Sequence, residues 1–415
     1  MEGGPDAFIS EKPWAMDLCK RVGLEDQLIG TRQEFRRSFV YQKGKLVPVP
    51  TGFYLMAPRN LASLFQAPLL SFFGKLRMAC ELFIPPKKEK GDESVASFVR
   101  RRFGREALEK IGQPMIGGIY TADPESLSLQ ATFPQFLQME EKYGSVIRAL
   151  DAEKNKAHQE ASGPRYGLFL TLKNGMEHLI AAIIRKMPEV VISSGKAVSK
   201  IGRDNNKWNI QLENGEKLEA DAICLAVPAF QAAKLTRPFD AMLARELEKI
   251  PYESSATVNM VFDRKDIPHA LDGFGFVVPA SEKRKIIGCT FVNVKFPGRA
   301  TENKILLRVF MGGALGPRIL DASDADLEST ALAEIQEILK ISKLPEKVLM
   351  RRYPRSMPQY EVGHLQTVAT IEESVKKHPG FYLTGNAYRG IGLPDCVRQA
   401  EKAAKAISQF LEQRV

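Results

Sequence analysis

The sequence predicts a mixed α/β protein, and three observations support this fold class. Residues 222–228 form a continuous apolar run, which is typical of a fully buried strand. Residues 255–313 hold four successive strand patterns. Residues 324–339 repeat apolar side chains at helical spacing, and residues 381–400 read as strand, glycine loop and helix. We therefore expect helices around a curved antiparallel or mixed sheet.

Length and charge narrow the class of protein. The 415 residues are enough for two hydrophobic cores, and 44% hydrophobic residues argue against disorder. The net charge of +10 indicates an anionic partner, which could be nucleic acid, an acidic lipid surface or a carboxylate-bearing substrate. Nucleic acid is the weakest of these, because the basic residues are scattered and no basic cluster is interleaved with aromatic residues.

Cysteine and histidine patterns exclude several chemistries. The five cysteines form no CxxC pair, so neither a zinc site nor a disulfide framework is predicted. The five histidines are dispersed, and no catalytic triad can be assembled from the sequence. No signal peptide and no apolar run long enough to span a bilayer is present, so we expect a cytoplasmic protein.

The first third of the chain predicts short helices and one hairpin. Residues 12–23 and 25–29 have helical patterns, and residues 35–48 form a hairpin that turns at Lys43-Gly44. Residues 60–81 are amphipathic and rich in Leu and Phe, with a break expected at Pro68. This stretch could lie in a lipid interface or roof a substrate cavity, and the pattern leaves both open.

The remaining elements follow the same signals. A helix over residues 94–110 is capped by Asp92 or Ser94. An Asn214-Gly215 turn joins two strands. The other expected elements are a helix that starts at 123–126, a polar linker at 153–162, strand, turn and helix over 164–185, strands over 189–201, a helix over 324–339 and a strand over 348–354.

The carboxyl-terminal segment is where the sequence suggests chemistry. The strand over residues 381–383 runs into Gly385, and two more glycines, Gly390 and Gly392, remove side chains where a flat ligand could lie against the main chain. The helix that begins after Pro394 points its free N–H groups at this loop, which favours negative charge there. A reduced flavin would satisfy this, but an ordinary strand, turn and surface helix would show the same spacing.

Several motifs in a consistent order carry a resemblance to a known family. They are GGPDAF at 3–8, GGIYTADPESLS at 117–128, TFPQF at 132–136, GFGFVVP at 273–279, MPQYEVGH at 357–364 and LTGNAYRGIGLPDC at 383–396. Together they resemble the protoporphyrinogen and coproporphyrinogen oxidase family, within the flavin amine-oxidoreductase group. The resemblance covers essentially the whole chain.

The resemblance implies an incomplete Rossmann-like FAD-binding domain with an inserted mixed-sheet substrate domain and a helical, membrane-facing subdomain. The implied FAD domain is 1–50, 186–235 and 365–415, the helical subdomain 51–163, and the sheet domain 164–185 and 236–364. A GxGxxG unit is expected before the GGPD segment, and the sequence has none there. We expect either that the start of the sequence was placed too late or that the gene has lost its amino-terminal GxGxxG unit.

The resemblance also assigns binding residues. Lys12 matches a substrate-binding position, and Ser38 stands where some members carry an arginine, so Arg37 becomes the expected propionate anchor. The positions implied to bind FAD are Gly4, Pro5, Asp6, Ala7, Val198, Gly385, Ile391, Gly392 and Leu393. Those implied to bind substrate are Lys12, Arg37, Gly118, Ile119, Gly275, Val277, Thr290 and Phe310. Without the resemblance, core packing would explain Gly275, Val277, Thr290 and Phe310, a helix kink would explain Gly118 and Ile119, and solvated charge would explain Arg37.

The implied activity is oxidation of a porphyrinogen to a porphyrin in heme biosynthesis. Hydride would pass to flavin N5, molecular oxygen would reoxidise the flavin, and hydrogen peroxide would be released. No protein acid, base, nucleophile or metal is assigned. Alternatives are another flavin oxidase, of amines or carotenoid precursors, or a non-catalytic porphyrin-binding remnant that cannot hold FAD. Peripheral membrane contact, a homodimer and docking to a ferrochelatase are further expectations.

Overall fold

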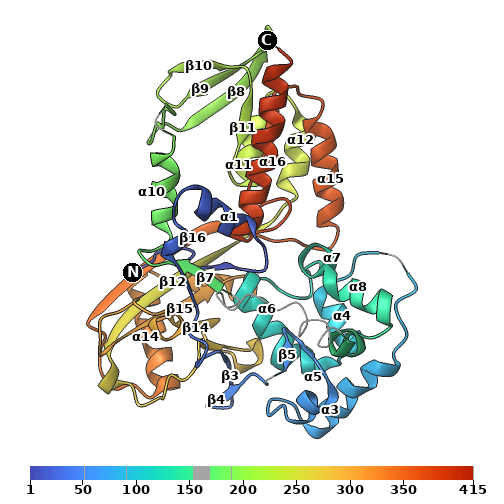
Figure 1. The fold of residues 1–415 in the computed structure, drawn as a ribbon, viewed down its shortest axis with the longest axis vertical. Helices are drawn as coiled ribbons and strands as arrows, with labels where there is room; N and C mark the ends of the chain where they lie inside the picture. Colours follow the sequence, from blue (N-terminus) through green and yellow to red (C-terminus); the bar gives the residue numbers. More distant parts are fainter. Residues whose placement is uncertain (51, 90, 153–168, 188, 415) are drawn as a thin grey trace. The chain divides into compact units, whose positions relative to one another are not determined.

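A seven-stranded mixed sheet organises the larger part of the chain in the computed structural model (Figure 1). Its order is β16-β12-β15-β14-β13-β3-β4, and every pair is antiparallel except β13 with β3. The structure describes all residues except 51, 90, 153–168, 188 and 415. The strands are β3 (Phe39–Gln42), β4 (Lys45–Pro48), β12 (Tyr252–Asp263), β13 (Gly275–Val277), β14 (Gly288–Phe291), β15 (Lys304–Gly312) and β16 (Lys347–Pro358).

The described residues divide into two compact units. The first unit holds Met1–Pro5, Ile29–Lys173 and Tyr252–Val362, and the second holds Asp6–Leu28, Asn174–Pro251 and Gly363–Val415. These bounds differ from the expected three parts, because the β3–β4 hairpin pairs with β13 and so joins the sheet of the first unit. The mixed α/β fold class itself is confirmed.

Helix α14 (Asp324–Leu339) covers one face of the large sheet (Figure 1). Alternate residues of β12, among them Val258 and Met260, share a buried apolar cluster with Leu327 and Ile335 of this helix. Because side chains alternate along a strand, the intervening residues of β12 point to the opposite face. One face of the sheet therefore forms the core, and the other is left for polar and half-buried side chains.

Most of the other helices of the first unit lie between β4 and β7 in the sequence, and α13 lies between β14 and β15. As expected, Pro68 separates α2 from α3, and Ser94 caps α4 by accepting a hydrogen bond from the Ser97 amide at 3.1 Å. A turn occupies residues 123–126, so the helix expected to start there begins only at Leu129. The helices are α2 (Leu61–Phe65), α3 (Phe72–Ala79), α4 (Val95–Arg102), α5 (Arg105–Ala107), α6 (Gln113–Tyr120), α7 (Leu129–Thr132), α8 (Pro134–Tyr143) and α13 (Val292–Lys295).

The second unit contains a three-stranded meander and a parallel pair. The meander is β8 (Val198–Asp204), β9 (Lys207–Leu212) and β10 (Lys217–Ala220), and the Asn214-Gly215 turn joins its last two strands as predicted. The pair is β11 (Ile223–Leu225) with β17 (Phe381–Leu383). Around them lie α1 (Trp14–Arg21), α10 (Glu177–Arg185), α11 (Ala229–Thr236), α12 (Ala241–Glu248), α15 (His364–Val375) and α16 (Leu393–Glu412).

The prediction of a fully buried strand over residues 222–228 was only half right. The segment is a strand, but Leu225 alone within β11 is buried and Cys224 is exposed. Among the described residues β11 pairs with β17 alone, so two strands cannot enclose both faces. The polar linker expected at 153–162 lies outside the described residues. The short strands not yet mentioned are β1 (Phe8–Ile9), β2 (Leu28–Gly30), β5 (Phe53–Tyr54), β6 (Ala57–Pro58) and β7 (Phe169–Leu172).

Candidate functional site

The loop between β17 and α16 in the second unit has the geometry that its glycines suggested. Gly385 has φ 126° and Gly390 has φ 113°, values that L-residues rarely adopt. A Cβ on Gly390 would lie 2.5 Å from the carboxyl carbon of Asp395, whereas a Cβ on Gly385 would meet no described atom within 4 Å. Gly390 is therefore required by the fold, and Gly385 faces open space.

The loop is held in place by α15. His364 Nε2 lies 2.9 Å from the Tyr388 carbonyl oxygen, and Arg389 donates to both carboxylate oxygens of Glu372 at 2.6 Å. The loop is thus anchored on one side before any ligand binds. Such preorganisation is what a cofactor cradle needs, because the backbone then pays little entropy on binding.

The amino terminus of α16 follows directly. Gly392 occupies the N-cap position in an extended conformation, and no side chain caps the helix. The first-turn residue Asp395 is buried, and its carboxylate lies 2.5 Å from Lys12 Nζ and 3.3 Å from Arg398 Nη2. Lys12 was expected to bind substrate, and in this structure its ammonium group forms an ion pair with Asp395.

These residues fit a flavin. Ile391, Gly392 and Leu393 place an uncapped helix terminus beside an open loop, and the N–H groups there favour negative charge. Thr384, at the start of the loop, is 7% exposed, and its hydroxyl has no hydrogen-bond partner within the described part of the chain. A buried hydroxyl without a partner is uncommon, and a bound ligand would satisfy it.

Cys396, in the first turn of α16, supplies no nucleophile beside this loop. Burial raises the pKa of its thiol, and the neighbouring Asp395 carboxylate raises it further. The thiol therefore stays protonated near neutral pH, where a protonated cysteine is a weak nucleophile.

The other predicted FAD residues are spread over the chain. Val198 begins β8 with 37% of its surface exposed, and Asp6 and Ala7 are half-buried residues of the second unit. Gly4 and Pro5 belong to the first unit. The structure thus collects Gly385, Ile391, Gly392 and Leu393 in one loop.

In the first unit, strand register brings four predicted substrate residues to one face of the large sheet. Gly275 pairs with Thr290, and Val277 pairs with Gly288, which in turn pairs with Phe310. Directly opposed residues in an antiparallel pair point to the same face, so all four share the face opposite α14. Val277, Thr290 and Phe310 are half-buried, in contrast to the buried residues between them.

Helix α6 lies beside this face. A Cβ on Gly118 would lie 3.1 Å from Val277 Cγ1, so the helix backbone approaches the strand closely. Ile119 follows it and is 46% exposed. Gly275 needs no ligand to explain it, because a Cβ there would lie 2.1 Å from the Cys289 carbonyl oxygen. Its glycine is dictated by sheet packing.

Arg37 does not present a free cation. Its guanidinium forms an ion pair with Asp272, and its Nε donates to the Asp272 carbonyl oxygen at 2.6 Å. The guanidinium also lies 5.8 Å from the Phe39 ring centroid. To bind a propionate, Arg37 would have to exchange Asp272 for the ligand.

The residues that hold the amino-terminal segment on the same face were not predicted from the sequence. Arg308, 2% exposed, donates to the carbonyl oxygens of Glu2 and Gly4 at 2.6 and 3.2 Å, and its Nε donates to Asn259 Oδ1 at 2.9 Å. Tyr353 donates to the Gly3 carbonyl oxygen. Only the register that places Arg308 opposite Asn259 and Thr290 could have revealed this, and that pairing is not local in sequence.

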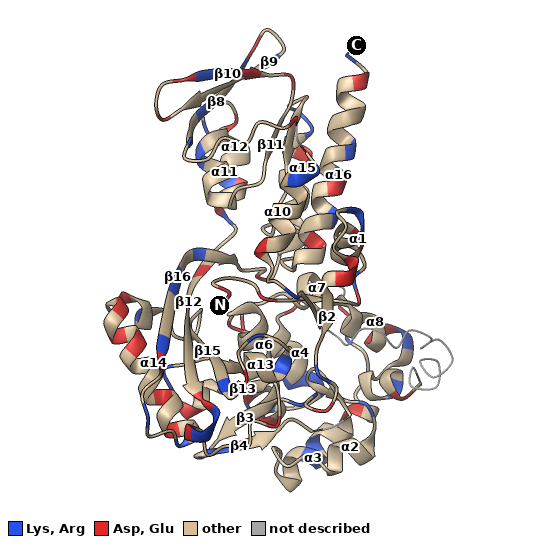
Figure 2. Ribbon diagram, turned by 60° about the vertical axis from the view of Figure 1, so that its left-hand side comes forward, with Lys and Arg blue, Asp and Glu red and all other residues tan. Residues whose placement is uncertain are grey.

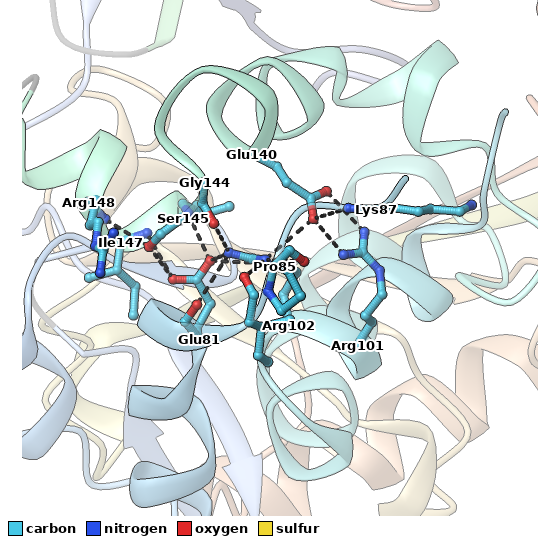
Figure 3. Close-up of polar contacts among 12 residues, drawn as sticks. Glu81, Pro85, Lys87, Arg101, Arg102, Glu140, Gly144, Ser145, Ile147 and Arg148 are labelled. Carbon is cyan, nitrogen blue, oxygen red and sulfur yellow. Dashed lines mark hydrogen bonds and ion pairs between the residues drawn. The ribbon is translucent and has the colours of Figure 1, made fainter. Parts of the chain in front are cut away.

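A buried charge network lies in the helical region, apart from these residues (Figure 3). Glu81 and Arg102 are fully buried and form an ion pair, and Glu81 also accepts hydrogen bonds from the Ser145 hydroxyl at 2.5 Å and the Val146 amide at 2.8 Å. Glu140 accepts from Arg101 at 2.5 Å. Every charge has partners within the protein, so the network is structural.

The network predicts acid sensitivity. Burial alone would raise the pKa of Glu140, but hydrogen bonding and charge from Arg101 and charge from Arg102 outweigh burial and lower the pKa below its ordinary value of 4.5. A lowered folded-state pKa stabilises the fold above the ordinary value, and this stability is lost as pH falls through the folded pKa. We expect thermal stability to drop steeply below about pH 4.5, and less steeply in Glu140→Gln, as measured by melting curves across pH. Equal slopes would contradict the assignment.

The second unit has a loop that fits a flavin, and the first unit has a sheet face lined by glycine and half-buried side chains. These are features of a flavoprotein oxidoreductase. Residues 1–408 match the family described as flavin containing amine oxidoreductase, and the chain belongs to that family. The predicted family and its flavin cofactor, FAD, are thereby confirmed.

Individual relatives cover nearly the whole chain. Coproporphyrinogen III oxidase from Bacillus subtilis (strain 168) is 32% identical over 413 residues, which are 99% of this chain and 87% of the relative. Chloroplastic protoporphyrinogen oxidase from Nicotiana tabacum is 28% identical and covers 99% of this chain and 77% of its own. A crystal structure of an Exiguobacterium sp. 255-15 protein, provisionally assigned as a protoporphyrinogen oxidase, has a TM-score of 0.86 and 29% identity, covering 99% and 88% of the two chains.

Proposed function

We propose that this chain oxidises a porphyrinogen to the porphyrin in heme biosynthesis. The observation that carries the proposal is that curated relatives of 24–32% identity, each spanning 98% or 99% of this chain, are named coproporphyrinogen III oxidase or protoporphyrinogen oxidase. Structural neighbours such as putrescine oxidase are only 13–14% identical and indicate the fold alone, so amine oxidation is the weaker alternative.

The proposed division of labour follows from the two sets of residues. Bound FAD would supply the redox chemistry, as a hydride acceptor at N5 that molecular oxygen regenerates with release of hydrogen peroxide. The amino end of α16 and the loop at Gly385 would hold the isoalloxazine and favour negative charge on it. The face formed by Val277, Thr290 and Phe310 would receive the macrocycle and shield it from water.

The test is direct. Flavin-loaded protein is mixed in air with coproporphyrinogen III or protoporphyrinogen IX, and porphyrin fluorescence and peroxide are followed. We expect fluorescence to rise with oxygen consumption, and anaerobic mixing to stop after the bound flavin is reduced. A yellow, flavin-bearing chain that gives no oxygen-dependent fluorescence would refute the proposal. A colourless chain that nevertheless binds porphyrin would favour the non-catalytic alternative.

A lipid-facing role for the helical region is a separate proposal. Phe72, Phe73 and Phe83 are 65%, 80% and 81% exposed, and the exposed Lys87 and Lys88 follow closely in sequence. Aromatic side chains beside lysines are typical of an interfacial surface. Within the described ranges no helix is both long and apolar enough to cross a bilayer. Figure 2 shows both basic and acidic residues on helices and strands of each unit.

We expect the triple change Phe72→Ser, Phe73→Ser and Phe83→Ser to weaken co-sedimentation with anionic phospholipid vesicles by about tenfold or more, because it removes the apolar area that would enter the lipid. The matched control is Leu344→Ser, since Leu344 is 75% exposed in the same unit but outside this region. If both variants bind vesicles as the parent does, the aromatic surface has another use.

A further inference from the structure

A cavity of about 670 Å³ opens in the first unit beside the proposed substrate face. Three segments line it: α6 with the two residues that follow it, the loop between β13 and β14, and the segment after β15. Its volume is in the range of sites that hold a drug-sized ligand. None of the site residues predicted from the sequence lines it.

The cavity adjoins the substrate face through shared elements. Gly117 and Val278 line it, and each is the immediate neighbour of a predicted substrate residue, Gly118 and Val277. The Ile287 amide, also from the lining, donates to the Phe310 carbonyl oxygen at 2.8 Å. The cavity and the face therefore share backbone at Gly117–Gly118 of α6 and at Val277–Val278, although consecutive side chains along a strand point to opposite faces of the sheet.

The walls are preformed. The Ala280 amide donates to Gln113 Oε1 at 2.8 Å, which ties the β13–β14 loop to α6. The Ala314 amide donates to the Thr121 carbonyl oxygen at 2.9 Å, which ties the turn after β15 to the end of the same helix. Gly313, at φ 72°, permits that approach, because a Cβ there would lie 2.7 Å from the Thr121 carbonyl oxygen. A preformed cavity costs little ordering when a ligand binds.

The charged side chains that line the cavity are all basic. Its lining includes Lys283, Arg284, Lys285 and Arg318 but no carboxylate. Arg284 is neutralised by Glu334 and Glu337, which lie outside the lining. Lys283, Lys285 and Arg318 are exposed, and their side chains form no ion pair or hydrogen bond with any described residue. Three cations thus remain available to an anionic ligand.

Most of the other side chains that line the cavity are apolar, apart from Gln113 and Thr121. Val278, Ile286, Ile287, Leu315 and Ile319 supply aliphatic surface, and Leu315 is 45% exposed. An inorganic anion would make no use of this surface, and an uncharged apolar ligand would make no use of the cations. The lining matches a ligand that has an apolar body and carries several negative groups.

We propose that this cavity binds an amphipathic polycarboxylate, with its apolar body against the aliphatic lining and its carboxylates at Lys283, Lys285 and Arg318. Resting on the proposed function, the ligand is the tetrapyrrole itself: the edge of its macrocycle contacts the aliphatic lining and its carboxylate arms reach the cations, while the rest of the ring lies on the substrate face. The cations would then select for the number of carboxylates that a tetrapyrrole carries.

The experiment measures equilibrium binding to the full chain by porphyrin fluorescence, with no turnover required. The probes are coproporphyrin III with four carboxylates, protoporphyrin IX with two and its dimethyl ester with none, and palmitate is the competitor with one. The test variant is Lys283→Gln, Lys285→Gln and Arg318→Gln. The control variant removes the same number of charges elsewhere in the unit through Lys265→Gln, Lys343→Gln and Lys347→Gln, all exposed.

We expect the test variant to bind coproporphyrin III about tenfold or more weakly than the parent, protoporphyrin IX less so, and the dimethyl ester unchanged, because only ligand carboxylates use the cations. The control variant should differ from the parent by less than about twofold. Equal weakening in both variants, tight binding of the ester to the parent, or competition by palmitate as strong as that by coproporphyrin would overturn the proposal.

The experiment distinguishes failure of the cavity assignment from failure of the proposed function. If the parent shows the expected carboxylate dependence but no oxygen-dependent oxidation, the function fails and the cavity assignment stands. If the parent oxidises porphyrinogens and the test variant keeps the parental Kd and KM, the function stands and the cavity assignment fails.

Discussion

Replacing Glu81 by glutamine is expected to destabilise the helical region by about 3–5 kcal/mol, the usual cost of removing one partner from a buried ion pair. The carboxylate and the Arg102 guanidinium are both fully buried, so water cannot compensate the lost charge. Arg102 would keep a single carboxylate, Glu140, with 3.4 Å between Nη1 and Oε1. The loss is a large share of the 5–15 kcal/mol that stabilises a typical domain.

The measurement should be local, because a chain with two compact units need not unfold in one step. Hydrogen exchange of the α4 amides in the parent and in Glu81→Gln reports the opening of this region. Glu109→Gln is the matched control, since it breaks the exposed Arg105–Glu109 pair nearby and should change exchange little. Equal exchange in both variants would show that Glu81 stabilises nothing beyond an ordinary surface pair.

A double substitution sharpens the argument. Glu81→Met combined with Arg102→Met removes both charges and leaves apolar side chains of similar length. It should cost less than Glu81→Met alone, because no unpaired charge remains buried. If the double variant is the less stable of the two, the polar contacts of Arg102 with the Ile84 and Gly144 carbonyl oxygens outweigh its pairing with Glu81.

This network also shows where inference from sequence ends. In the sequence Arg102 is the last of three consecutive arginines, and no nearby residue distinguishes it from Arg100 and Arg101. Its partner Glu81 lies 21 residues away, and Ser145 is 64 residues from Glu81. No local periodicity reports such pairings, because they arise only when α4, α8 and their connections pack together.

Elements defined by nearby residues were predictable. The hairpin turn at Lys43-Gly44 has both residues at positive φ, and α14 occupies Asp324–Leu339 with Ser323 as its N-cap. Each is specified by a few adjacent residues: a turn dipeptide in one case, and an apolar stripe with a capping serine in the other. The prediction of burial failed where burial depends on residues that are distant in sequence, as it does for β11.

The residues of the candidate site also divide into those predictable from nearby sequence and those that depend on distant contacts. The glycine loop and the start of α16 were readable because Gly385, Gly390 and Pro394 are close in sequence. Val277 and Phe310 entered only through the resemblance, and the structure supplies the physical link, which is their common pairing with Gly288. The ion pair between Lys12 and Asp395 spans 383 positions and could not have been foreseen from either residue.

Gly385→Ala is expected to lower flavin affinity by roughly ten- to a hundredfold, corresponding to about 1.4–2.7 kcal/mol. The residue has φ 126°, a region nearly closed to other residues, so part of the loss is backbone strain in the loop. The other part is contact: the new methyl group would meet no described protein atom within 4 Å, so only a bound ligand could clash with it.

A second glycine of the same unit separates strain from ligand contact. Gly23 also has positive φ, 77°, and a Cβ there likewise meets no described atom within 4 Å, but it lies at the end of α1, outside the loop. Both alanine variants should lose some thermal stability without flavin, whereas only Gly385→Ala should lose flavin affinity, measured by fluorescence titration with FAD. Since neither change clashes within the described protein, similar affinities in the two variants would place the isoalloxazine away from Gly385, and the assignment of this loop as the cofactor cradle would have to be abandoned.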